Sequence, residues 1–207
     1  MTTTLKVYNA ALFAVGQRKL ASTTEAVESQ RVITEVYADV VNYCLEQGQW
    51  NFATRAVKID ADPGITIEFG YSNAFGKPVD WRQTCEISAA ANFMPPLLDY
   101  RDEVDYWVAD CDPLYVAYVS NDVLWGLNLS AWPETFARYV ELELACVIHP
   151  RLKNETGFPE LEKRRLKALR DAKNKDAKNE GPKQVIAGRL IRARRGGSSI
   201  TGSDRGL

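Results

Sequence analysis

Apolar residues recur at helical spacing at the start of the chain. Residues 5–17 have one apolar face, which predicts a first helix. That face consists of Leu5, Tyr8, Leu12 and Val15. Ser22 and Glu25 have the spacing of a capping box, which predicts a second helix from Ser22 to a C-terminal cap at Gly48. Its buried stripe is expected to be Ile33, Val36, Tyr37, Val40 and Cys44.

From residue 53 to residue 130 the apolar pattern changes to a period of two. This alternation predicts strands at residues 56–60 and 65–69, joined by a turn at Asp62-Pro63-Gly64. Further short strands are expected at residues 84–88, 106–108 and 114–119. Prolines interrupt the region repeatedly. We therefore interpret it as a small β-rich platform with long loops.

Helical spacing returns at Trp132, and Pro133 suits the first turn of a helix, where its missing N–H is not needed. The apolar face of this third helix consists of Phe136, Val140, Leu144 and Val147. His149-Pro150 is expected to end it. A fourth helix is predicted over residues 158–179, with a narrow apolar stripe. The stripe consists of Phe158, Leu161, Leu166, Leu169 and Ala172.

These patterns predict an α+β fold: a bundle of four helices, taken from both ends of the chain, that a β-rich platform interrupts. The predicted parts are residues 1–52 and 131–180 for the helical bundle, residues 53–130 for the β-rich insert, and residues 181–207 for an extended basic tail. The 207 residues suffice for one domain with such an insert.

Charge divides the chain along its length. Residues 1–150 contain 10 Lys and Arg against 20 Asp and Glu, whereas residues 151–207 contain 16 against 7. The whole chain therefore has a formal charge of only −1. The start of the chain lacks the basic and then apolar pattern of a signal peptide, and no apolar run approaches the length of a membrane span. We expect the protein to fold in a cytoplasm, with no membrane as a partner.

Few residues suggest catalytic or metal-binding chemistry. The chain has one histidine, His149, for which we expect a structural or capping role. It has no phosphate-binding glycine loop and no Gly-x-Ser-x-Gly elbow. The four cysteines, Cys44, Cys85, Cys111 and Cys146, lie far apart and are expected to be reduced packing residues. We expect no catalytic site, no metal and no cofactor.

Two groups of residues leave alternatives open. The first is the acidic group Asp99, Asp102, Glu103, Asp105, Asp110 and Asp112. It could bind calcium or act as a glycosidase acid and base, although a solvated or partner-facing acidic loop is the simpler interpretation. The second is the aromatic group Trp50, Phe52, Phe69, Tyr71, Phe75, Trp107, Tyr115, Tyr118 and Trp125. It could stack bases, but its acidic surroundings favour core and subunit-interface positions.

The tail from residue 181 combines aliphatic and basic side chains. Its candidate binding residues are Val185, Ile186, Arg189, Leu190, Ile191, Arg192, Arg194 and Arg195. The arginines could follow a phosphate backbone. Alternatively, the aliphatic residues could pack into a protein groove while the arginines meet carboxylates. We favour docking on a protein, because nonspecific DNA contact has little use for four aliphatic anchors.

An ordered series of segments resembles the head-to-tail adaptor proteins of tailed bacteriophages, closest to the tail tubular protein A type of short-tailed phages. The series consists of residues 43–53 (YCLEQGQWNFA), 69–75 (FGYSNAF), 112–116 (DPLYV), 132–136 (WPETF), 169–177 (LRDAKNKDA) and 192–197 (RARRGG). No single segment is specific, whereas their order is, and the resemblance covers most of residues 5–180.

The resemblance implies a structural virion protein, not an enzyme, with a helical bundle interrupted by a β-containing region. Such a protein forms a ring, usually of twelve copies, between the portal and the tail tube or nozzle. DNA then passes through the ring during genome ejection without specific binding. The resemblance also implies the portal as the partner of the tail. The alternatives are a DNA-contacting protein that uses the tail on phosphates and a cell-wall hydrolase that uses carboxylates near Asp102.

Overall fold

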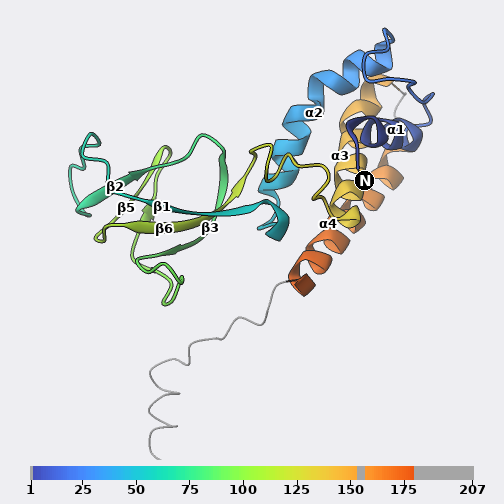
Figure 1. The fold of residues 1–207 in the computed structure, drawn as a ribbon. Helices are drawn as coiled ribbons and strands as arrows, with labels where there is room; N and C mark the ends of the chain where they lie inside the picture. The colour runs from blue at the N-terminus through green and yellow to red at the C-terminus, as the bar shows by residue number, and fades with distance from the viewer. Residues whose placement is uncertain (1, 153–156, 180–207) are drawn as a thin grey trace, which may run out of the picture.

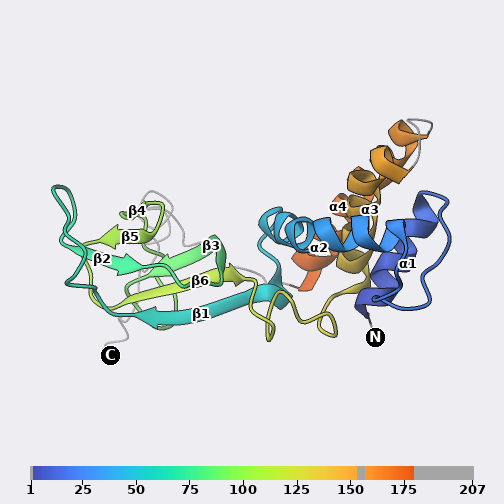
Figure 2. The ribbon, with the colours of Figure 1, turned by 90° about the horizontal axis from the view of Figure 1, so that it is seen from above.

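The computed structural model describes residues 2–152 and 157–179 and places helices at one end of an elongated molecule and strands at the other (Figures 1 and 2). The helices are α1 (Thr4–Ala14), α2 (Glu28–Glu46), α3 (Glu134–Leu152) and α4 (Phe158–Asn179). The strands are β1 (Thr54–Ile59), β2 (Asn73–Gly76), β3 (Trp81–Ser88), β4 (Arg101–Asp102), β5 (Tyr106–Ala109) and β6 (Leu114–Ser120). The predicted α+β class is confirmed, with helices from both ends of the chain. The predicted tail lies outside the described residues.

Helix α1 has well-defined caps at both ends. The Thr3 hydroxyl accepts a hydrogen bond from the Lys6 N–H at 3.2 Å, as expected of an N-cap threonine. Gly16 has a φ of +72°, a left-handed conformation that ends the helix, and the Gln17 N–H returns to the Leu12 carbonyl at 2.8 Å. The helix therefore ends at Ala14, before the predicted boundary at residue 17.

The predicted start of α2 is wrong, because the polar residues before it close a loop. The Ser22 hydroxyl accepts the Thr24 N–H at 3.1 Å, and the Glu25 carboxylate accepts the Ala21 N–H at 2.7 Å. The helix begins at Glu28 after Val27, whose side chain makes no capping bond. In the predicted stripe, Ile33, Val40 and Cys44 are buried, whereas Val36 and Tyr37 are only half-buried.

The C-terminal ends of α2 and α3 also differ from the predictions. The cap of α2 is Gln47, which has a right-handed conformation, and a Cβ at Gly48 would lie only 3.2 Å from the Trp50 ring. Gly48 therefore makes room for an indole and does not cap the helix. Pro150 lies within α3, which ends at Leu152. A proline in the last turn of a helix has few backbone hydrogen bonds to disrupt, so the helix continues past it.

Helix α4 has the predicted bounds and packs along α3. Its buried residues are Leu161, Ala168 and Ala172, spaced seven and four positions apart, so the two alanines let the helices approach closely. Leu166, predicted to be in the stripe, is exposed because it lies off this face. The core that the four helices enclose includes the large side chains Trp50, Phe136 and Tyr139.

The strands form two antiparallel three-stranded sheets, with orders β1-β6-β3 and β2-β5-β4. The predicted strands at residues 56–60, 84–88, 106–108 and 114–119 correspond to β1, β3, β5 and β6. The prediction of a strand at residues 65–69 is wrong: these residues form a loop, and Phe69 is 75% exposed. The reason is that β1 pairs with β6, distant in sequence, and not with the segment that follows it. The turn at Asp62 does form, since its side chain accepts the Gly64 N–H at 2.8 Å.

The two sheets share a second core, distinct from that of the helices. Its buried residues are Phe75, Ile87, Trp107, Ala109, Leu114, Val116 and Tyr118. The Lys77 side chain crosses between the sheets, with its Nζ 3.8 Å from the centre of the Trp81 ring and in an ion pair with Asp102. The Trp107 indole donates to the Thr84 hydroxyl at 3.1 Å. Polar contacts therefore fix one sheet on the other.

The junction between strands and helices is built around aromatic residues. The Trp132 indole donates to the Gly126 carbonyl at 2.8 Å, and the Trp50 indole donates to the Cys44 carbonyl at 3.0 Å. The rings of Trp50 and Phe136 lie 4.9 Å apart. Val119 of β6 belongs to the helical core, so the central strand of the first sheet is anchored in the bundle.

Candidate functional site

The sequence-predicted binding residues lie outside the part of the chain that the structure describes. They are Val185, Ile186, Arg189, Leu190, Ile191, Arg192, Arg194 and Arg195. The structure does place the point from which they continue. The Asp176 carboxylate accepts the Asn51 backbone N–H at 3.1 Å, and the Asn51 side chain donates to the Asp176 carbonyl. The end of α4 is therefore attached just beyond the C-terminal end of α2.

The acidic residues from Asp99 to Asp112 do not form one site. Asp99 accepts the Tyr71 hydroxyl at 2.9 Å, Asp110 accepts the Ser72 N–H at 2.8 Å, and Asp112 accepts the Ala61 N–H at 3.1 Å. All three carboxylates therefore brace the connection between β1 and β2, residues 60–72. Within the described residues, no group of histidine, cysteine and acidic side chains is arranged to hold a metal ion. The calcium interpretation of this group therefore has no support.

Asp102 has a structural environment. Its carboxylate accepts the Thr84 hydroxyl at 2.8 Å and the Trp107 indole N–H at 3.2 Å, and it pairs with Lys77. These three partners join β4 to β3, to β5 and to the residue after β2, so the carboxylate has a structural role.

The aromatic residues do not form a stacking platform. Trp50, Phe75, Trp107 and Tyr118 are fully buried, as the core interpretation predicts. Phe69 is an exception, because it lies exposed on a loop. Phe52, Tyr71, Tyr115 and Trp125 are half-buried. Flat binding of bases requires exposed rings on one face, and the four buried rings are unavailable for it.

His149, Cys44 and Cys146 are buried in the helical region, whereas Cys85 and Cys111 belong to the strand region and are half-buried. The His149 ring lies with its centre 5.5 Å from that of Phe158. Cys44, Cys111 and Cys146 are free thiols. Burial raises the pKa of the Cys146 thiol to about 11, and it also raises the pKa of Cys44. Thiols with raised pKa values are poor nucleophiles at neutral pH, which agrees with the predicted packing role.

Sequence reasoning missed the most heavily bonded carboxylate of the strand region. Asp80 accepts hydrogen bonds from the hydroxyls of Ser120 and Tyr118, and it pairs with Arg55 at 3.0 Å. Burial raises the pKa of Asp80, but the hydrogen bonds from Ser120, Arg55 and Tyr118 outweigh it and lower the pKa overall. No sequence signal identifies this group, because its partners are 25 to 40 positions away.

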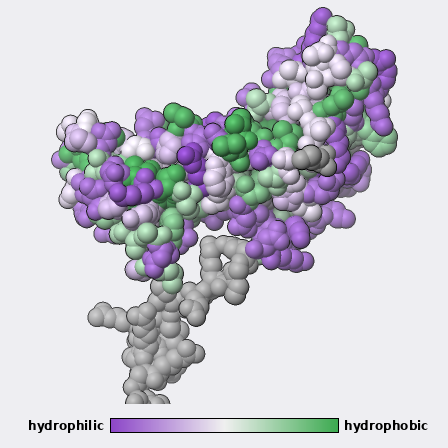
Figure 3. All heavy atoms as spheres, in the orientation of Figure 1, coloured by the Kyte–Doolittle hydropathy of each residue, from purple (hydrophilic) through white to green (hydrophobic). Residues whose placement is uncertain are grey.

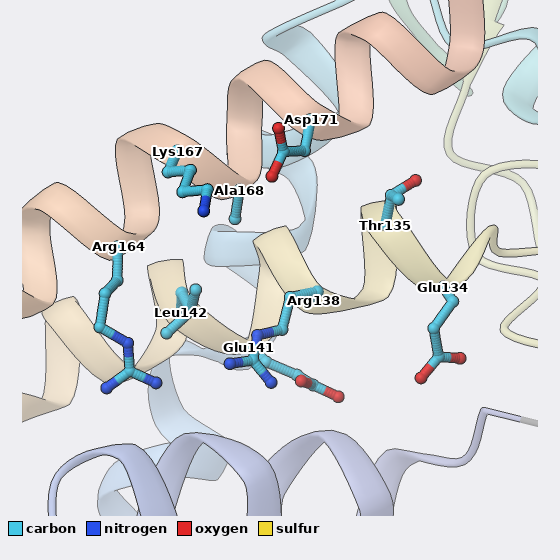
Figure 4. Close-up of a pocket in the computed structure, with 9 residues that line it drawn as sticks. All are labelled: Glu134, Thr135, Arg138, Glu141, Leu142, Arg164, Lys167, Ala168 and Asp171. Atoms are coloured by element: carbon cyan, nitrogen blue, oxygen red, sulfur yellow. The ribbon is translucent and has the colours of Figure 1, made fainter.

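A groove of about 510 Å³ between α3 and α4 gathers charges of both signs (Figure 4). We call it the charged groove. Its lining consists of Glu134, Thr135, Arg138, Glu141, Leu142, Arg164, Lys167, Ala168 and Asp171. Arg138, Arg164 and Lys167 form no ion pair with any described residue. Glu141 is 8% exposed, and burial raises its pKa, which the nearby Arg138 partly offsets. Mixed charges with no assembled nucleophile and base are typical of a protein-binding surface.

A second groove lies between α2 and α3 and is largely apolar. We call it the apolar groove. Its lining consists of Val36, Asp39, Val40, Tyr43, Glu143 and Val147, and its volume is about 390 Å³. The Tyr43 and Val147 side chains are each 44% exposed, although both are large and apolar. Glu143 is held by Arg165 of α4 at 3.1 Å. Aliphatic side chains of another segment are suited to pack on this surface.

Further apolar side chains are exposed near the junction of strands and helices. Val79, Val123 and Leu124 are all exposed, and the Asn121 N–H donates to the Asp80 carbonyl at 2.9 Å, which brings their two loops together. Figure 3 shows apolar surface gathered over this part of the molecule. Exposed apolar patches of this kind mark contacts with other proteins more often than catalytic sites.

The chain matches no known family model. A search of curated proteins also finds no significant match. No helix within residues 2–152 and 157–179 combines the length and apolar character that a membrane span requires. The interpretation of these surfaces therefore depends on their own chemistry and on the series of sequence segments described above.

Proposed function

We propose that this chain is a head-to-tail adaptor of a tailed phage. It is a structural virion protein that forms a ring, of about twelve copies, between the portal and the tail tube or nozzle. Residues 181–207 dock on the portal, and the ring forms part of the DNA channel. The observation that carries the proposal is the order of elements: two helices, an inserted pair of small sheets, and two helices again. This is the arrangement that the resemblance implies.

Charge also supports the proposal. Residues 53–130 contain 5 Lys and Arg against 12 Asp and Glu, so the strand region is strongly acidic. A wall of the same sign as DNA lets a duplex slide past without sticking. The basic tail, by contrast, carries four aliphatic residues beside its arginines, a composition suited to a protein groove.

The surfaces of the described region favour assembly over catalysis. The charged groove, the apolar groove and the exposed residues near Val79 all offer contact area, and none combines a nucleophile with a base. We therefore propose no enzymatic activity and no cofactor for this protein.

Deleting residues 181–207 tests the docking role of the tail. We expect the truncated protein to keep its helical circular dichroism and its unfolding transition, because both hydrophobic cores lie within the described residues. We expect it to lose capture by portal-bearing capsids in a pull-down. A matched control replaces residues 181–207 with a glycine-serine segment of equal length, which separates loss of side chains from loss of length. Saturating capture of the truncated protein would contradict the assignment.

The same proteins distinguish the DNA-contacting alternative. A tail that binds phosphates would give duplex binding that disappears on deletion and weakens by about 0.9 log units per log unit of salt for each phosphate neutralised. We expect the full chain to bind portal far more tightly than duplex DNA at physiological salt.

A further inference from the structure

The apolar groove lies within reach of the residues that follow the described chain. Its Tyr43 end is in the last turn of α2, and Asn51, soon after that helix, is hydrogen-bonded to Asp176 near the end of α4. The chain leaves the described region at Asn179, three residues later. Glu143 of the groove pairs with Arg165, so the tail starts about 21 Å along the axis of α4 from this pair.

The tail is long enough to reach the groove. From Asn179 to Val185 the backbone can span at most about 20 Å. From Tyr43 to Val36 helix α2 rises by about 10 Å. From Asn179 to Leu190 the backbone can span at most about 38 Å, so Leu190 and Ile191 can reach the groove without moving α4.

The charges of helix α2 and of the tail are also complementary. Helix α2 contains four acidic residues, Glu28, Glu35, Asp39 and Glu46, against one basic residue, Arg31. Among the described residues, Asp39 and Glu46 form no ion pair. The tail segment at residues 185–195 combines four aliphatic residues with four arginines and has no acidic residue. An apolar floor with acidic edges fits a segment of this composition.

We propose that the apolar groove holds residues 185–195 of the same chain. The aliphatic side chains of this segment cover Val36, Val40 and Val147, and its arginines face Asp39 and Glu46. The contact shields an apolar surface in the free subunit. A further consequence rests on the proposed function: portal binding then competes with the groove, so the docking segment is released only where a portal offers a better site.

Amide hydrogen exchange of the full-length protein tests the groove contact. We expect amides of residues 185–195 to exchange at least about tenfold more slowly than in a synthetic peptide of residues 181–207. Val147→Lys should abolish this protection, because it places a charge in the apolar floor. Phe13→Lys is the matched control: Phe13 is also apolar and 72% exposed, but it lies on α1 outside the groove, so protection should remain.

A second variant leaves the groove intact. Leu190→Asp with Ile191→Asp changes only the tail and should also abolish the protection. Exchange as fast as in the peptide overturns the proposal, and so does protection that Val147→Lys leaves unchanged. Protection that appears only at high protein concentration overturns it too, because a second copy would then be the occupant. None of these measurements involves a portal, so their outcome is independent of the pull-down.

Discussion

Asp80 shows how one side chain can hold three strands together. It lies directly before β3, Arg55 belongs to β1, and Ser120 ends β6. Because β6 is the central strand of its sheet, the carboxylate joins all three strands at the end nearest the helices. Its two hydroxyl donors and one guanidinium satisfy the charge without a metal or a substrate.

Replacing Asp80 with asparagine tests this role. The pKa of Asp80 is lowered in the folded protein, so its stabilisation is complete above the unfolded pKa and is lost as pH falls through the folded pKa. We expect Asp80→Asn to reduce the free energy of unfolding by about 1.5–3 kcal/mol at pH 7, measured by urea denaturation. The difference from wild type should shrink below about pH 4.

A surface carboxylate provides the control for Asp80. Asp60→Asn removes an exposed partner of Lys58 and should leave the free energy of unfolding almost unchanged, because solvent screens exposed ion pairs. An equal loss for Asp80→Asn at every pH would show that shape, and not charge, accounts for the effect.

At the scale of elements, the turn between β6 and α3 depends on Gly126. Its N–H donates to the Ser120 carbonyl at 3.1 Å, and its carbonyl receives the Trp132 indole. A Cβ at this position would collide with the Ser120 carbonyl oxygen and lie 3.0 Å from Leu45 Cδ1. The turn therefore needs a residue without a side chain.

We expect Gly126→Ala to cost about 1–3 kcal/mol of stability, because the backbone must move to relieve the collision. Thermal and urea unfolding would measure the loss. Gly76→Ala is the matched control, since a Cβ there meets no atom within 4 Å and Gly76 has no left-handed conformation. Comparable destabilisation by the two substitutions would contradict this account.

The elements differ in how far the sequence could predict them. Helix α4 was predictable because its apolar stripe runs along one partner, α3, and does not depend on distant pairing. The start of α2 was not predictable. The side chains of Ser22 and Glu25, which a capping box would use, accept hydrogen bonds from N–H groups of the loop before the helix. Strands β2 and β4 are too short to show a period, and they form only against β5.

The candidate surfaces were less predictable than the fold. The charged groove is lined by Arg138 and Lys167, which lie on different helices, and no spacing along the chain indicates that they share one groove. The acidic residues near Asp102 looked like a cluster in the sequence, but Asp99, Asp110 and Asp112 bind the connection between β1 and β2, whereas Asp102 binds Thr84 and Trp107. These partners are distant in sequence, so spacing along the chain does not reveal them.

At the scale of the whole molecule, its surfaces differ from one end to the other. The strands and the helices lie at opposite ends (Figure 1), with acidic loops among the strands and the charged and apolar grooves on the helices. Copies that associate through two different surfaces form closed rings when the rotation between neighbours closes.

The mass of the protein alone and with its portal tests ring formation. We expect native mass spectrometry or light scattering to show about one adaptor copy per portal subunit after mixing. Raising the salt concentration should weaken the assembly, because exposed charges are screened over about 8 Å at physiological ionic strength. A single copy bound per portal ring would contradict the proposed architecture.

The pairing of β1 with β6 has a consequence for the history of such a chain. Thr54, where the strand region begins, lies directly opposite Val119, near where it ends. Facing residues of antiparallel strands have Cα atoms only about 4.5–5.5 Å apart. A tight turn could therefore replace the strand region, or a different module could be inserted there, while the four helices keep their packing. The bundle can thus serve as a constant frame for different inserted modules.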